Sequence, residues 1–145
     1  MEKLRKLIAS VSFAALIASF GFSAVAQAAT FSDVSEDHWA YEAVEQLVAD
    51  GVVDVADTFR CDASSERSDF AKMVAEAFGL GDSTDYDAGF SDVVAGAWYA
   101  VYINVLAQNG VMTGDMDAAG DLTGTVRPSA YVNRAEAAKM VALAA

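Results

Sequence analysis

This sequence has little of the chemistry on which active sites and cross-linked folds depend. It contains one cysteine, Cys61, so no disulfide can form within the chain and packing alone must hold the fold. Its one histidine, His38, lies among acidic residues and has no equivalent elsewhere in the chain. Acidic residues are plentiful, but no pair stands out as a general acid and its partner. The sequence therefore predicts a protein that is not an enzyme and that needs no cofactor.

Basic residues are also scarce, and three of the nine lie at the very start of the chain. They precede an apolar run over residues 7–25, which is followed by a small-residue cleavage signature at Ala26-Gln27-Ala28. This pattern is typical of a signal peptide, so we expect residues 1–28 to form a cleavable apolar helix and the protein to be secreted. An uncut membrane anchor is the alternative. No later apolar run is long enough to cross a bilayer, so no membrane span is expected after cleavage.

Acidic residues dominate the rest of the chain. The whole sequence has a net charge of −12, and beyond residue 28 six basic residues stand against 20 acidic ones, a balance of −14. Binding to nucleic acid requires clustered lysine and arginine, and adhesion to anionic lipid requires basic segments. The charge therefore argues against both of these partners.

What the chain does have is a duplication. Its six remaining basic residues form two matching sets 67 positions apart, namely Arg60, Arg67 and Lys72, then Arg127, Arg134 and Lys139. Earlier landmarks repeat at a distance of 59, because Phe31-Ser-Asp-Val34 returns as Phe90-Ser-Asp-Val93. The second unit is therefore eight residues longer. We expect one repeat over 29–80, a linker over 81–89 and a second repeat over 90–145.

Each repeat is predicted to be two helices joined by a loop, so the fold class is all-α. The first helices are expected from Trp39 to Ala49 and from Trp98 to Asn109. Gly51 and Gly110 lie within two residues of their ends and accept a left-handed conformation. The closing helices start near the arginines 67 and 134, and Asn133 with Glu136 has the spacing of a capping box. Two apolar faces are predicted on them, one formed by Phe70, Met73, Val74 and Ala77 and the other by Ala137, Met140, Val141 and Ala144. A repeat of this size buries too little surface alone, so the two are expected to pack together.

The ordered set of repeated motifs resembles the S-layer homology (SLH) domain. The set runs through Phe-Ser-Asp-Val, Trp39-Ala-Tyr41, Gly-Val and Thr-Phe-Arg60 to the helix start Asn133-Arg-Ala-Glu136, which stands degraded as Glu66-Arg-Ser-Asp69 in the first copy. The resemblance implies tandem helix–loop–helix repeats and a non-catalytic anchor in the cell envelope. Its expected partners are cell-wall polysaccharide or peptidoglycan-linked polymer, and its expected location is the cell wall, cell surface or periplasm. The family usually has three repeats, so a homo-oligomer or association with other SLH proteins is also expected.

The same resemblance suggests which residues touch the polymer. The family's helix-start arginine corresponds to Arg67 and Arg134, and its groove residues correspond more loosely to Asp33, Trp39, Asp92 and Trp98. A guanidinium binds a carboxylate through two parallel hydrogen bonds, and an indole can stack on a sugar ring. The alternatives are a structural salt bridge of Arg134 with Glu136 or another acid, and burial of the two tryptophans in the core.

Two other functions remain open on the sequence alone. A structural surface-layer protein would act by self-association. A weak calcium-binding extracellular module would use Asp115, Asp117 and Asp121 in the longer loop of the second repeat, which begins like an EF-hand loop. That match is poor, because Ala119 and Val126 stand where calcium ligands are required.

Overall fold

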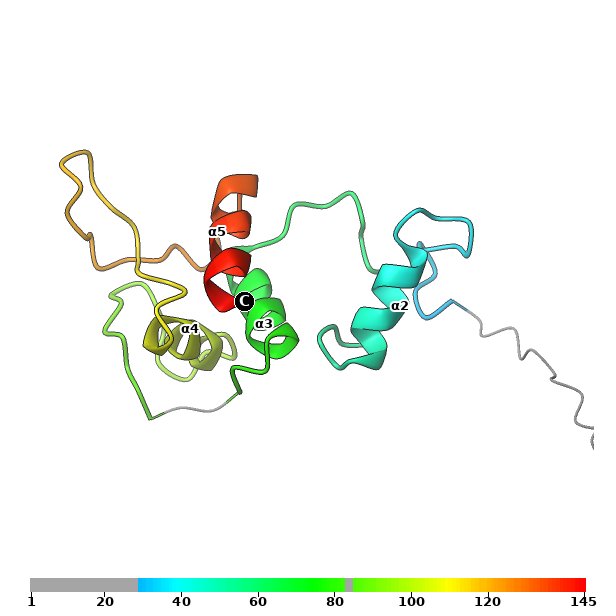
Figure 1. The fold of residues 1–145 in the computed structure, drawn as a ribbon, viewed down its shortest axis with the longest axis horizontal. Coiled ribbons are helices and arrows are strands. Elements are labelled where there is room, and N and C mark those ends of the chain that lie inside the picture. The colour runs from blue at the N-terminus through cyan, green and yellow to red at the C-terminus, as the bar shows by residue number, and fades with distance from the viewer. Residues whose placement is uncertain (1–28, 83–84) are drawn as a thin grey trace, which may run out of the picture.

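The structure is a computed structural model that describes residues 29–82 and 85–145 (Figure 1). Over these residues the chain forms four helices, namely α2 (Tyr41–Ala49), α3 (Arg67–Ala77), α4 (Ala100–Gln108) and α5 (Arg134–Ala144). Over the described residues there is no strand, only two isolated bridges between backbone segments. The all-α prediction and the two helix–loop–helix repeats are confirmed. The predicted signal peptide, residues 1–28, lies outside the described residues.

The first helix of each repeat begins later than predicted. Trp39 and Trp98 precede α2 and α4 in consecutive turns, in which the backbone N–H of Tyr41 donates to His38 and that of Ala100 donates to Ala97. Neither helix has a side-chain cap. Both tryptophans are therefore held on turns ahead of a helix. In the described part of the chain no helix has the length and apolarity to cross a bilayer.

The closing helices start in two different ways. The capping box of α5 is confirmed, since the Asn133 side chain accepts from the Glu136 N–H and the Glu136 carboxylate accepts from the Asn133 N–H. Helix α3 has no side-chain cap. Its first N–H groups instead donate to the loop of the second repeat, from Arg67 to the Ala130 carbonyl and from Ser68 to the Pro128 carbonyl. The start of α3 is thus fixed by a tertiary contact rather than by a local sequence signal.

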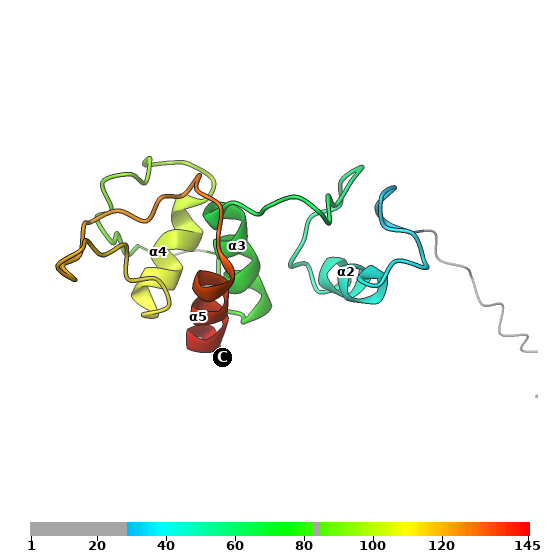
Figure 2. The same ribbon diagram turned by 90° about the horizontal axis from the view of Figure 1, so that it is seen from above.

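The hydrophobic core does not follow the repeat boundaries. Helix α3 belongs to the first repeat by sequence, but it packs against α4 and α5 of the second. Figures 1 and 2 show these three helices grouped together, with α2 apart from them beyond a long connecting loop. A smaller cluster forms around α2 from Phe31, Val34, Ala40 and Val44. The Phe59 ring packs on that of Phe31 with centroids 5.3 Å apart, so the first repeat's loop closes this cluster.

The predicted apolar faces of the closing helices are wrong in part. In α3 the most buried apolar side chains are Ala71, Val74 and Ala75, whereas Ala77 is exposed. In α5 Met140 is buried as predicted, but Val141 is 42% exposed. The physical reason is that α3 contacts two helices at once and needs a broad buried surface with small residues, while α5 is covered on one side.

Candidate binding site

Each repeat holds its loop in place with one aspartate. Asp33 accepts hydrogen bonds from the N–H groups of Phe59 and Arg60 at 2.8 and 2.7 Å. Asp92 does the same in the second repeat, accepting from Val126 at 3.0 Å and Arg127 at 2.7 Å. The structure therefore uses both predicted site aspartates to shape the loops.

The second residue of each clamped pair has an unusual backbone. Arg60 and Arg127 have positive φ values of 62° and 50°, in the left-handed region that non-glycine residues rarely enter. The paired N–H groups that bind one carboxylate stabilise this conformation. In the first repeat, the Phe59 N–H that donates to Asp33 is the main cause of a lowered pKa of that carboxyl. In each repeat the aspartate and the arginine with the positive φ thus act together to fix the conformation of the loop.

Arg67 is buried, with only 6% of its surface exposed. Its Nε donates to the Val126 carbonyl oxygen at 2.7 Å, and its Nη1 lies 3.1 Å from Glu136 Oε1. Both partners belong to the second repeat. In this conformation Arg67 joins the two repeats, and its guanidinium is not open to solvent.

Glu136 is the centre of the charged cluster at this junction. Beside Arg67, it accepts from Arg127 Nη2 at 3.0 Å and from the Asn133 N–H at 3.0 Å. Arg127 also binds Asp115 through two hydrogen bonds of 2.7 and 2.9 Å. The Asn133 N–H is the main cause of the lowered pKa of Glu136, and the Arg127 hydrogen bond is the main cause of the lowered pKa of Asp115. Arg127 thus ties the loop of the second repeat to the start of α5.

The remaining candidates lie on the surface. Arg134 is exposed and has no ion pair with any described residue. Trp39 is 90% exposed and Trp98 is 55% exposed, so burial of the tryptophans in the core is wrong. Each indole lies beside another ring, with centroids 5.7 Å from His38 for Trp39 and 5.6 Å from Tyr99 for Trp98. The six candidates therefore divide into three that hold the scaffold and three that meet solvent.

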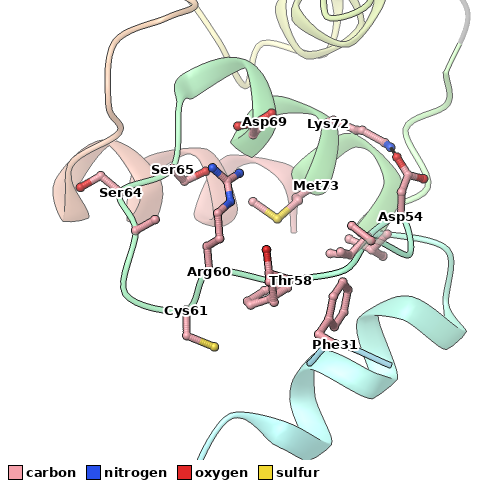
Figure 3. Close-up of a pocket in the computed structure, with 15 residues that line it drawn as sticks. Phe31, Asp54, Thr58, Arg60, Cys61, Ser64, Ser65, Asp69, Lys72 and Met73 are labelled. Carbon is pink, nitrogen blue, oxygen red and sulfur yellow. Dashed lines mark hydrogen bonds and ion pairs between the residues drawn. The ribbon is translucent and has the colours of Figure 1, made fainter. Parts of the chain in front are cut away.

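A cavity of about 390 Å³ lies in the first repeat between the loop that follows α2 and the start of α3 (Figure 3). Thr58, Ser64 and Ser65 supply hydroxyls, and Lys72 pairs with Asp54 at one edge. Arg60 is exposed and, among the described residues, its side chain has no ion-pair partner. Its equivalent in the second repeat, Arg127, does bind a carboxylate of the following helix, Glu136 of α5.

The acidic loop of the second repeat is organised by its own backbone. Asp115 is engaged by Arg127, and Asp117 accepts from the N–H groups of Ala119 and Asp121 at 2.8 and 3.0 Å. Nowhere in the described ranges do three or more histidine, cysteine, aspartate or glutamate side chains come together as a metal ion requires.

Comparison with known proteins agrees with this duplicated geometry. The family model of the S-layer homology domain matches residues 30–60 and 89–117, one segment in each repeat. The chain is 30% identical over 112 residues to the S-layer protein sap of Bacillus anthracis and to an S-layer protein of Bacillus thuringiensis subsp. finitimus. These alignments cover 76% of this chain and 14% of each relative. The two units are S-layer homology repeats.

Other relatives of the S-layer homology repeats carry the names of enzymes. An amylopullulanase of Thermoanaerobacterium thermosulfurigenes is 33% identical over 88 residues, which cover 59% of this chain and 5% of that enzyme. The chain thus spans a small part of the relatives it matches. Repeats of this family are anchoring modules of the cell envelope, so the chain is associated with the cell surface or wall.

Proposed function

We propose that this chain is a non-catalytic anchor that binds cell-wall polysaccharide or a peptidoglycan-linked polymer through its two S-layer homology repeats. The protein would act after secretion, at the cell wall, the cell surface or in the periplasm. The matched enzymes share only this module with the chain, over 5% of the amylopullulanase, so their names carry no activity over to it. The bound polymer and the location in the cell envelope are both parts of this proposal.

The observation that supports this proposal most is the exposure of Trp39 and Trp98. They occupy equivalent positions in the two repeats and lie 90% and 55% exposed on the turns before α2 and α4. Removing the apolar surface of an indole from water is favourable in free energy. Two exposed tryptophans at equivalent positions therefore favour a ligand that covers them. A pyranose ring has an apolar face that fits a flat indole. The two repeats would therefore present two stacking positions to one polymer.

Arg134 is the cation that best complements such a polymer. Its guanidinium is exposed at the first residue of α5, and no described carboxylate pairs with it. A planar guanidinium can bind a polymer carboxylate with two hydrogen bonds. Arg67, Asp33 and Asp92 take a different part in the proposal, because each of them holds a loop and so positions the exposed groups.

Co-sedimentation of the purified protein with cell-wall sacculi tests the proposal. The native protein is expected in the pellet, and Trp39→Ala/Trp98→Ala is expected to lose at least tenfold in apparent affinity because both stacking surfaces are gone. Arg134→Ala is expected to weaken binding less and to reduce its dependence on salt. Leu122→Ala is a matched control, since Leu122 is also a large apolar side chain at 62% exposure but has no equivalent in the first repeat.

The controls decide between binding and folding. Circular dichroism must show native helix content for each variant. Native protein that stays in the supernatant with sacculi of several envelope types would remove the anchoring proposal. Equal binding by the native protein and the folded double tryptophan variant would remove these side chains from it.

A further inference from the structure

Helices α3 and α5 are equivalent in sequence but not in burial. In α3 the apolar face formed by Ala71, Val74 and Ala75 is 0%, 3% and 0% exposed. Its equivalents 67 residues later are Ala138, Val141 and Ala142, and all three are exposed. The face of α3 is covered by the second repeat, because α3 packs on α4. The matching face of α5 is apolar and lies open.

The arginines at the starts of these helices show the same contrast. Arg67 is buried between the Val126 carbonyl and the Glu136 carboxylate of the second repeat. Arg134 is its equivalent and is exposed, with no ion pair among the described residues. Helix α3 binds the second repeat through its apolar face and Arg67, and α5 carries the equivalents of both.

The cavity of the first repeat is lined by the equivalents of the residues that receive α3. In the second repeat the start of α3 contacts Val126, Pro128, Ala130 and Glu136. Their equivalents 67 residues earlier all line the cavity, and they are Phe59, Cys61, Ala63 and Asp69. The cavity thus has the residues of a binding surface for a helix start. In the second repeat the equivalent surface is occupied by the start of α3, and in the first repeat it is open.

The size of the cavities agrees with this interpretation. The corresponding hollow in the second repeat, between Val111, Met112 and Met140, has a volume of about 190 Å³ and is partly lined by Arg67 itself. The equivalents Val52, Val53 and Met73 line the larger cavity of about 390 Å³ in the first repeat. Arg67 thus occupies part of the space in the second repeat that is open in the first.

The charges are also complementary. Asp69 is the equivalent of Glu136, is exposed in the cavity wall, and has no ion pair within the described part of the chain (Figure 3). The carbonyl of Phe59 corresponds to that of Val126, the acceptor of Arg67. Arg134 on α5 and Asp69 in the first repeat, neither of which is ion-paired with a described residue, thus carry opposite charges.

We propose that the chain associates head to tail, with α5 of one copy docked on the first repeat of a second copy. Arg134 enters the cavity and binds Asp69 and the Phe59 carbonyl, while Ala138, Val141 and Ala142 pack toward α2. The contact is heterologous, since it joins two different surfaces, α5 of one copy and the cavity of the first repeat of the other. Each dimer keeps one free end of each kind, so association extends beyond two copies unless a ring closes.

A charge exchange tests this geometry. Sedimentation velocity of the purified protein over a range of concentrations is expected to show species larger than one chain. Arg134→Asp and Asp69→Arg are each expected to weaken association at least tenfold, since each creates a like-charge pair. An equimolar mixture of the two variants is expected to recover association, because one contact then has the native pair and the next has the reversed pair. The double variant Arg134→Asp/Asp69→Arg is expected to associate for the same reason.

Two further variants separate the possible outcomes. Val141→Asp places a charge on the exposed apolar face of α5 and is expected to give single chains with native circular dichroism. Leu122→Ala is expected to associate as the native protein does, because Leu122 lies in the longer loop of the second repeat and belongs neither to the cavity wall nor to α5. A native protein that remains a single chain at millimolar concentration would overturn the proposal, as would single-charge variants that associate normally. Failure of the mixture to recover would exclude the Arg134–Asp69 pair.

This inference does not rest on polymer binding, since the association measurements described above are made without polymer. The two proposals share Arg134, and this makes a further outcome measurable. A polymer that binds Arg134 should shift associated protein toward single chains, whereas a polymer held by the tryptophans alone should leave association unchanged. If the native protein sediments with sacculi but does not self-associate, only the proposed head-to-tail contact is overturned.

Discussion

The Nε of Arg67 donates to the carbonyl oxygen of Val126 at 2.7 Å, across 59 residues of sequence. This bond lies inside the protein, where Arg67 is 6% exposed, and it joins the closing helix of the first repeat to the loop of the second. It explains why two equivalent arginines have different surroundings. Arg67 has a following repeat to bind within the described chain, and Arg134 has none there.

The first prediction compares these two arginines. Arg67→Ala is expected to lower the free energy of unfolding by about 2–4 kcal/mol, because it leaves the Val126 carbonyl and part of the Glu136 charge without their partner in a buried place. Arg134→Ala is expected to change it by less than about 0.5 kcal/mol, as for most surface substitutions. Urea denaturation followed by circular dichroism measures both. Equal effects would contradict the different roles assigned to the two residues.

The second prediction concerns the start of α5. Asn133→Ala removes the acceptor of the Glu136 N–H and is expected to lower stability by about 1 kcal/mol. The matched variant is Glu66→Ala, because Glu66 is the N-cap residue of α3 and its side chain makes no capping hydrogen bond. Its expected effect on stability is close to zero. Thermal unfolding of the two variants, measured together, shows whether the cap matters only where it is formed.

The third prediction concerns the aspartate that clamps the second loop. Asp92→Ala removes the acceptor for the N–H groups of Val126 and Arg127 and is expected to lower stability by about 1–3 kcal/mol. Asp33→Ala should also destabilise, through the equivalent loop. Asp121→Ala is the control, since its exposed side chain accepts no hydrogen bond from a described residue. If Asp92→Ala matched this control, the clamp would not stabilise the loop.

The fourth prediction is a pH dependence centred on Glu136. The folded protein lowers the pKa of this carboxyl below its ordinary value of 4.5, first through the Asn133 N–H and then through Arg67 and Arg127. A lowered folded pKa gives stability above pH 4.5 that is lost as the pH falls through the folded pKa. The melting temperature of the native protein should therefore fall on acidification below that pH. Glu136→Gln should melt lower at neutral pH and depend less on pH, and a parallel decline of both proteins would contradict this assignment.

Much of the fold could be predicted from repeated residues. The 59- and 67-residue distances locate both helix pairs, and the spacing of Asn133 and Glu136 predicts a capping box that the structure contains. The start of α3 could not be predicted as well. Its N–H groups donate to the carbonyls of Pro128 and Ala130, and backbone acceptors leave no signal in the side-chain sequence. The exposure of Trp39 and Trp98 was also not predictable, since an indole is common both in cores and at binding surfaces.

The sequence by itself determined that this chain is acidic, duplicated and helical, and its motifs identify the repeats as S-layer homology repeats. These properties depend on residue type and on local spacing. The tertiary structure decided which copy of each residue is buried, because burial depends on the neighbour that packs there. Helix α3 packs on α4, and Arg67 with Val74 is covered. Helix α5 carries the same pattern, and Arg134 with Val141 remains at the surface.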